Sequence, residues 1–221
     1  MLRDSSLSYH SGEISVASNY EVDRIWNFID TNISGFVPYF QSFKDSNKEN
    51  RISDFLIYYF QCCMSEQLNG FSPYYFGKNP TQPQSDRETD VGVFAIIPNA
   101  KPVTLIEFEA KRLSKTANNK EYVCGERGGI ERFKREKHAP HLSVCGMLGY
   151  VQSKDTKHWV NQINNWIHEL SDRNTDISIH WSNEEILTKV IAFPKVGKYF
   201  SNHRRPSMNN NISLWHYFIE L

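Results

Sequence analysis

The chain has 221 residues, enough for one large domain or two small ones. Its 25 basic and 25 acidic side chains cancel, which excludes the overall basic excess of a histone-like or ribosomal protein. The hydrophobic content of 39% and the aromatic content of 14% exclude a disordered chain, because this much apolar surface can offset the entropy lost on folding. With no internal repeat and no long linker, we expect a single domain over residues 1–221.

The apolar residues are dispersed along the chain. No stretch approaches the run of about 20 apolar residues that spans a bilayer, and the first residues lack the apolar segment of a signal peptide. We therefore expect a soluble, cytoplasmic protein with no membrane partner. The four cysteines are too few for a disulfide framework in a chain of this length, so we expect free thiols.

Apolar residues at helical spacing predict two helices in the first third of the chain, at 20–31 and 48–67. Gly35 and Pro38 are expected to end the first helical region. The second helix is followed by a stretch rich in glycine and proline, which leaves room for a short strand at 74–76.

An antiparallel hairpin is predicted next, from the β-rich segments 87–97 and 102–113 that flank a short turn. Beyond the hairpin, helical and strand patterns follow in turn. The later predicted helices span 128–138 and 156–171, and the later predicted strands span 141–152, 177–181, 187–193 and 212–219, with a polar loop between the last two. This order indicates an α/β fold with a mixed central β-sheet flanked by helices.

Charge is unevenly distributed along the chain. The first hundred residues are net acidic, whereas residues 101–150 carry ten basic and six acidic side chains. Most of the basic excess lies between Lys111 and Lys137, a stripe that suits a phosphate backbone. A solvated helix face is the alternative interpretation, because Glu131 and Arg135 stand four residues apart and can pair with each other.

The predicted hairpin places charged residues on a strand that is otherwise apolar. Alternate side chains of a strand share a face, so Glu107, Glu109 and Lys111 point one way and the apolar residues between them point the other. Counted back from the turn, Asp90 falls opposite Glu109, and their carboxylates stand about 5 Å apart if they share a face. Two carboxylates this close repel each other unless a cation lies between them.

Mg²⁺, or Mn²⁺ in its place, is the cation that suits this pair, because Mg²⁺ prefers oxygen ligands and is held by one or two carboxylates with water and phosphate oxygens. The Ala110 carbonyl is a further candidate ligand. Lys111 is placed to polarise an attacking water or to stabilise charge on a phosphoryl oxygen. Asp90, Glu109 and Lys111 are therefore candidate catalytic residues, and Asp90, Glu109 and Ala110 are candidate metal ligands.

This motif, Thr89-Asp90 followed across a turn by Glu109-Ala110-Lys111, resembles that of the PD-(D/E)xK nuclease superfamily, the restriction-endonuclease-like enzymes. Thr89 stands where the family name has proline. The core of that family is a helix, a three-stranded meander, a second helix and a further strand. The elements predicted for about 48–152 follow the same order, with N- and C-terminal elaborations on either side.

The resemblance also assigns roles to residues outside the hairpin. Many members carry an acidic residue in the first core helix, which by analogy makes Glu49 a catalytic residue and a further metal ligand. Glu107 is left as an outer residue or a ligand of a second metal. The basic helix falls where the second core helix of the family borders the active site. The residues expected to bind nucleic acid are Arg112, Lys115, Arg127, Arg132 and Lys134.

The resemblance implies a Mg²⁺- or Mn²⁺-dependent nuclease that hydrolyses phosphodiester bonds, of DNA rather than RNA, by in-line attack of a metal-activated water. It further implies a prokaryotic or phage setting such as restriction, antiviral defence or repair, and a homodimer or partner subunit. Two other hypotheses stay open: a nuclease-like module that only binds nucleic acid or protein, and a hydrolase that uses paired carboxylates on glycosides. Zinc binding by Cys124, His138, His141 and Cys145 is not favoured, because their spacing matches no usual zinc motif.

Overall fold

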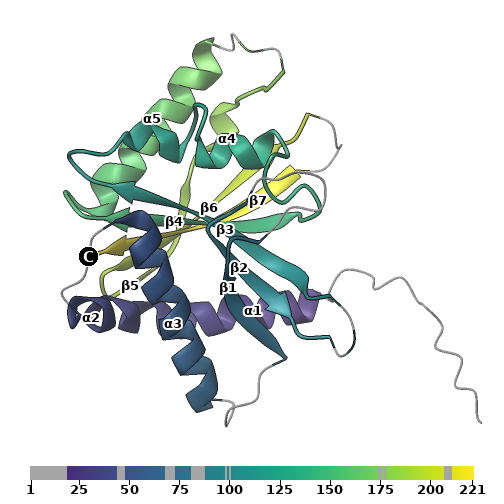
Figure 1. Ribbon diagram of the computed structural model, residues 1–221. Helices are drawn as coiled ribbons and strands as arrows, with labels where there is room; N and C mark the ends of the chain where they lie inside the picture. Colours follow the sequence, from purple (N-terminus) through teal and green to yellow (C-terminus); the bar gives the residue numbers. More distant parts are fainter. Residues whose placement is uncertain are drawn as a thin grey trace, which may run out of the picture.

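A mixed seven-stranded sheet lies between two groups of helices (Figure 1). The computed structural model describes residues 19–43, 48–67, 73–80, 88–97, 99, 101–173, 176, 178–206 and 211–221. The strands are β1 (Tyr74–Lys78), β2 (Val91–Ala95), β3 (Val103–Leu113), β4 (Val144–Val151), β5 (Thr188–Phe193), β6 (Val196–Arg204) and β7 (Asn211–Glu220). The helices are α1 (Asn19–Asn32), α2 (Phe36–Gln41), α3 (Glu49–Gln67), α4 (Gly129–Lys134) and α5 (Thr156–Arg173), with short 3-10 turns η1 (Ile33–Gly35), η2 (Asn119–Tyr122) and η3 (Asn183–Glu185).

The strands lie in the order β1-β2-β3-β4-β7-β6-β5. The β3–β4 and β4–β7 pairs are parallel, and the other neighbours are antiparallel. The predicted α/β class with a mixed central sheet is therefore confirmed, as is the hairpin of β2 and β3. Because β7 pairs directly with β4, the C-terminal strands continue the same sheet. None of the helices in the described ranges is long and apolar enough to cross a membrane.

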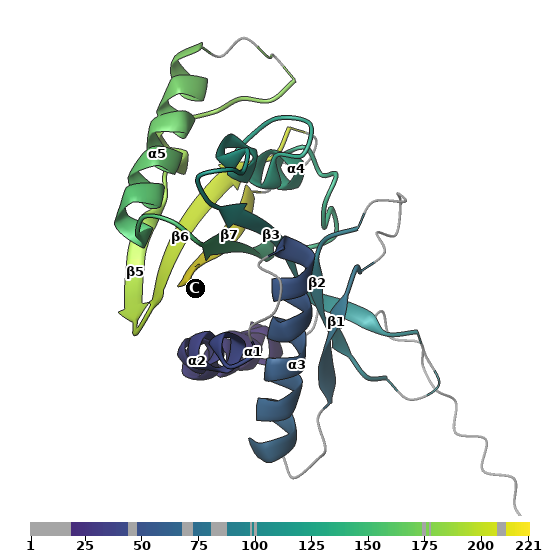
Figure 2. The ribbon, with the colours of Figure 1, turned by 60° about the vertical axis from the view of Figure 1, so that its left-hand side comes forward.

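Side-chain alternation divides the core into two clusters, one on each face of the sheet. Phe108 and Ala110 of β3 point into the cluster covered by α1, α2 and α3, where the ring of Trp26 packs edge-on against Phe108. Met147 and Phe218 point into the opposite cluster, covered by α4 and α5. Figure 2 shows the two groups of helices on either side of the sheet. The acidic residues of β3 alternate with Phe108 and Ala110, so they face the side of α4 and α5.

Several predicted boundaries change. The helix predicted at 128–138 ends at Lys134, because the chain then passes through positive φ at Glu136 (57°) and Ala139 (44°). Pro38 does not end the first helical region as predicted. It lies in the first turn of α2, where a proline is tolerated because that N–H has no helical partner.

Two predictions in the C-terminal third are wrong. The segment predicted as a strand at 177–181 is irregular over its described residues 178–181, where Ile179 and Trp181 nevertheless join the core; residue 177 lies outside the described residues. The polar loop predicted before the last strand contains β6, which pairs with both β5 and β7.

The sequence pattern did not predict β6, because polar residues occupy its inward-facing positions. Lys198, Ser201 and His203 are buried. The Lys198 ammonium lies 2.6 Å from an Asp30 carboxylate oxygen and 4.3 Å from the centre of the Trp215 ring. The Ser201 hydroxyl lies 2.7 Å from Nε2 of His203. Each of these polar groups therefore meets a partner inside the protein, which permits its burial.

The Asp30–Lys198 pair fastens α1 to the sheet, since the Tyr217 hydroxyl of β7 also donates to Asp30, at 2.7 Å. Asp30→Ala leaves the buried Lys198 ammonium without its carboxylate and should lower the free energy of unfolding by about 3 kcal/mol. Urea unfolding followed by circular dichroism measures this. Asp54→Ala is the matched control, because its partner Lys78 is exposed, and it should cost less than about 1 kcal/mol. Equal losses of unfolding free energy in the two variants would contradict a stabilising role for the buried Asp30–Lys198 pair.

Candidate active site

The register of β2 and β3 brings Asp90 beside Glu109. Val91 pairs with Phe108, and the Asp90 N–H donates to the Phe108 carbonyl at 3.0 Å, which places Asp90 just before β2 and next to this part of β3. Nearer the turn the register differs by one residue, and Leu105 of β3 is the extra residue at this irregularity. The ladder ends at the Val91–Phe108 pair, so a direct pairing of Asp90 with Glu109 stays a prediction, although the charge of Glu109 acts on Asp90.

Three basic side chains surround the buried Glu109 carboxylate. Its Oε1 lies 2.6 Å from the Lys111 ammonium and 3.3 Å from Nη1 of Arg132. Its Oε2 lies 3.3 Å from Nε2 of His138. The Glu109 side chain is 3% exposed, so the Lys111 and Arg132 contacts supply the compensation that water would otherwise give to its charge.

Asp90 accepts a hydrogen bond from a backbone group of the neighbouring strand. The Ala110 N–H donates to Oδ2 of Asp90 at 2.7 Å. Burial, and next the charge of Glu109, raise the pKa of Asp90 from its ordinary value of 3.8 to about 6, although the Ala110 N–H and the nearby Lys111 and Arg132 act in the opposite direction. Burial is therefore the main cause of the raised pKa of Asp90, and the charge of Glu109 is the second.

Glu49 approaches from the first turn of α3. Its Oε2 accepts a hydrogen bond from the Arg112 N–H at 2.5 Å, which places the carboxylate at the end of β3. Burial raises the pKa of Glu49 and the charge of Asp90 adds to this, while Lys111 opposes it. The structure therefore brings Glu49, Asp90, Glu109 and Lys111 into one charged cluster, as the sequence predicts.

Lys111 is the cation at the centre of this cluster. Burial alone would lower the pKa of Lys111, but Glu109, Glu49 and Asp90 together raise it above its ordinary value. At neutral pH the Lys111 side chain is therefore an ammonium group that donates hydrogen bonds, and it has no lone pair with which to accept a proton.

The donor set suits a hard cation such as Mg²⁺. Asp90 and Glu109 offer carboxylate oxygens, and the Ala110 carbonyl lies on the same edge of β3 as the N–H that Asp90 accepts, because both groups of a strand residue point toward the same neighbour. Within the described part of the chain, no three His, Cys, Asp or Glu side chains form a group that could hold a metal ion. A cation here would complete its shell with water and substrate oxygens, as Mg²⁺ commonly does.

A pocket of about 540 Å³ opens beside the cluster. Glu49 and Lys111 form one wall of it, and Arg112 and Arg127 contribute further positive charge. The remaining lining residues are Lys48, Thr116, Ala117, Asn118 and Glu121. Four basic side chains against two acidic ones make this pocket net positive, as a phosphate-binding surface requires.

Comparison with known proteins adds no assignment: the chain matches no protein-family model, no curated protein and no solved structure.

The predicted nucleic-acid-binding residues separate into three groups. Arg112 and Arg127 line the pocket. Lys115 is exposed and directly precedes Thr116, which also lines the pocket. Arg132 is directed at Glu109. Lys134 is fully buried, so its prediction as a phosphate-binding residue is wrong. Successive helical residues turn by about 100°, so a position two residues beyond Arg132 points to the other side of α4.

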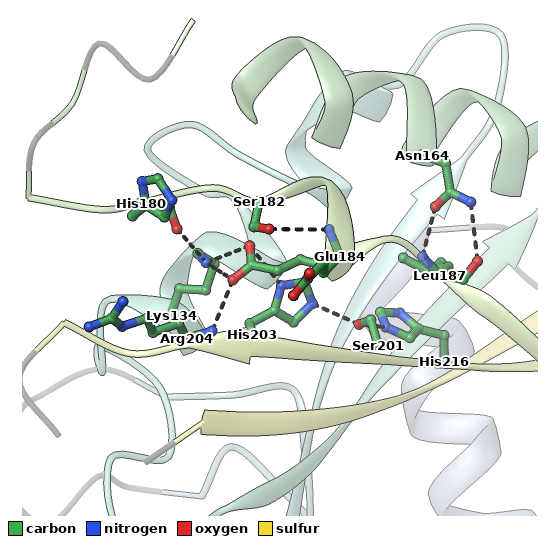
Figure 3. A network of polar contacts seen from close by, with 11 residues as sticks. Lys134, Asn164, His180, Ser182, Glu184, Leu187, Ser201, His203, Arg204 and His216 are labelled. Atoms are coloured by element: carbon green, nitrogen blue, oxygen red, sulfur yellow. Dashed lines mark hydrogen bonds and ion pairs between the residues drawn. The ribbon is translucent and has the colours of Figure 1, made fainter. Parts of the chain in front are cut away.

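Lys134 is part of a buried polar network, shown in Figure 3. Its ammonium lies 2.6 Å from Oε1 of Glu185 and donates to the His180 carbonyl at 2.9 Å. Glu185 also accepts from the Arg204 N–H and lies 3.5 Å from Nδ1 of His203. These contacts tie α4 to η3 and β6. The network therefore fixes the backbone from which Arg132 extends.

His138 is a site residue that the sequence did not assign, except as an unfavoured zinc ligand. It is buried and reaches Glu109 from the turn after α4. Its only sequence signal is its place near the end of the basic stripe. Glu107 is also fully buried, where its Oε2 accepts from the Thr89 hydroxyl at 2.9 Å and its Oε1 lies 3.8 Å from Nε2 of His141. Glu107 therefore lies two residues before Glu109 on the same face of β3, next to the cluster rather than in it.

The raised pKa of Asp90 predicts a pH-dependent gain in stability for Asp90→Asn. The unfolded chain ionises this carboxyl more readily than the folded protein does, so the folded state loses stability as the pH rises from about 4 to about 6. Asn cannot ionise, and its carbonyl can still accept from the Ala110 N–H. We expect the variant to be more stable than wild type by about 2 kcal/mol at pH 8, with the difference shrinking toward pH 4.5.

Urea unfolding in EDTA across this pH range measures the effect. Asp172→Asn removes an exposed carboxylate of α5 and should show no such pH dependence. An Asp90→Asn variant less stable than wild type at pH 8 would contradict the assignment.

Proposed function

We propose that the protein is a metal-dependent nuclease that hydrolyses phosphodiester bonds, with DNA as the preferred substrate. The observation that carries this proposal is the convergence of Asp90, Glu109 and Lys111 at the ends of paired strands, with Glu49 beside them. Paired carboxylates next to an ammonium supply a cation site and a charge donor for the same reaction. The resemblance to the PD-(D/E)xK motif assigns this arrangement to nucleic-acid hydrolysis.

The order of the elements agrees with the proposal. The chain runs through α3, the meander β1-β2-β3, then α4 and the strand β4 that lies parallel to β3. This is the order of the restriction-endonuclease-like core. Fold alone does not determine chemistry, so the argument depends on the cluster.

Each residue has a role that follows from its surroundings. Asp90, Glu109 and the Ala110 carbonyl would hold Mg²⁺ or Mn²⁺, with Glu49 at the outer edge of the site. When bound, the metal supplies a water of lowered pKa and a Lewis acid for the phosphoryl oxygen. Lys111 donates to the attacking water or to the phosphoryl oxygen; because its pKa is raised, it stabilises charge rather than removing a proton.

Cleavage assays test the proposal directly. Purified protein incubated with supercoiled, linear and single-stranded DNA, and with RNA, should cut DNA only when Mg²⁺ or Mn²⁺ is present. Glu109→Gln and Lys111→Met each remove a charge from the reacting centre and should lower the cleavage rate by at least 100-fold. Glu184→Gln, on the exposed 3-10 turn η3, is the control and should cut as wild type does.

The outcomes separate the competing hypotheses. Cutting that persists in Glu109→Gln would refute the site. Metal-independent hydrolysis of glycosides would favour the carboxylate-pair hydrolase, for which Lys111 is not needed. Binding of nucleic acid that is unchanged in Asp90→Ala and Lys111→Ala, without any cutting, would favour the binding module.

The basic pocket predicts a separate effect on affinity. Arg127→Gln removes an exposed guanidinium from the pocket and should weaken binding of a DNA duplex by about threefold to tenfold, with a shallower dependence on salt. Fluorescence anisotropy of a labelled duplex measures both quantities. Arg173→Gln, at the exposed end of α5, makes the same change away from the pocket and should leave affinity unchanged. Equal affinities for wild type and Arg127→Gln would exclude this pocket as the phosphate-binding surface.

A further inference from the structure

The Arg132 guanidinium lies between the active site and solvent. Its Nη1 contacts Oε1 of Glu109 at 3.3 Å and Nε2 of His138 at 3.2 Å, and its Nη2 donates to the Glu126 carbonyl at 3.3 Å. Its Nε is buried, and within the described part of the chain it has no hydrogen-bond partner. The guanidinium thus uses long contacts and leaves one donor unsatisfied, although buried donors are usually paired.

A divalent cation and Arg132 compete for the same oxygen. Oε1 of Glu109 already lies 2.6 Å from the Lys111 ammonium and 3.3 Å from Nη1 of Arg132. A metal ion bound to this carboxylate would repel the adjacent guanidinium. Since the Arg132 contact is the longer of the two, breaking it costs less free energy than breaking the Lys111 contact.

The surrounding structure allows the side chain to move without moving its helix. The Arg132 N–H donates to the Gly128 carbonyl, and the N–H groups of Lys137 and His138 lie 2.9 Å and 3.3 Å from the Arg132 carbonyl. The Lys134 network holds the next turn of α4. The Arg132 side chain itself is 23% exposed, so its guanidinium has access to solvent while its backbone stays fixed.

We propose that Arg132 couples metal binding to substrate binding, an inference that rests on the proposed nuclease function. In the metal-free protein the Arg132 guanidinium contacts the Glu109 carboxylate. A divalent cation at Asp90 and Glu109 displaces it, and the freed guanidinium binds phosphate oxygens of the nucleic acid through paired N–H donors. Because coupling between binding sites is reciprocal, the metal strengthens binding of the phosphodiester and the phosphodiester strengthens binding of the metal by the same factor.

The test measures affinities rather than cleavage. Mn²⁺ is titrated calorimetrically into wild type, Arg132→Gln and Arg132→Met, and binding of a labelled phosphorothioate DNA duplex is measured by anisotropy with and without saturating Mn²⁺. Both variants should bind Mn²⁺ at least threefold more tightly than wild type in the absence of DNA. Mn²⁺ should tighten duplex binding at least fivefold in wild type, and by a factor at least threefold smaller in the variants, which keep only the direct contact between metal and phosphate.

Lys137→Gln is the matched control, because it removes an exposed positive charge of the same segment whose side chain is not part of the Glu109 cluster. Its Mn²⁺ affinity should equal that of wild type, which excludes a general effect of net charge. Circular dichroism confirms that each variant is folded, and Arg132→Met keeps the apolar stem of the side chain if Arg132→Gln is unstable.

The outcomes distinguish this inference from the proposed function. Equal Mn²⁺ affinity in wild type and both Arg132 variants, with binding lost in Asp90→Asn, would overturn the coupling and leave the metal site in place. Absence of Mn²⁺ binding in wild type and in the Arg132 variants alike would overturn both.

Discussion

The carboxylate of Asp90, just before β2, is held against β3 by the Ala110 N–H and lies within the electrostatic reach of Glu109, and the rest of the site surrounds these two acids. A buried pair of like charges persists only where cations or hydrogen bonds compensate it. Here Lys111 contacts one Glu109 oxygen and the Ala110 N–H holds Asp90. Burial, and next the charge of Glu109, nevertheless raise the pKa of Asp90. Carboxylate oxygens held close together in this way are the donors that a cation such as Mg²⁺ prefers.

The parts around this pair differ in rigidity. The backbone of α4 is held by buried residues on its inner side, among them Phe133 and the Lys134–Glu185 pair. The side chains that reach the cluster from outside, such as Arg132, are long and partly exposed. The fold therefore combines carboxylates fixed on the sheet with a longer, partly exposed cationic side chain from α4.

Much of the hairpin could be predicted from the sequence, because β3 alternates strictly between acidic and apolar residues over Glu107, Phe108, Glu109 and Ala110. The strand β6 could not, because its inward residues are polar and their partners Asp30 and His216 lie far along the chain. Lys134 and His138 show the same limit at the site. Neither the burial of Lys134 nor the approach of His138 to Glu109 follows from local spacing, since both depend on where α4 docks on the sheet.

The extra residue Leu105 has a consequence for how this protein can vary over evolutionary time. Without it the register of the pairs Phe94–Thr104 and Ala95–Val103 would continue, and Val91 would oppose Glu107 instead of Phe108. With it the alignment of Val91 with Phe108, beside the acidic cluster, is set within the ladder rather than at the turn. A change in the length of the loop between β2 and β3 therefore need not alter this alignment, whereas loss of Leu105 would shift the start of β2 by one residue against β3.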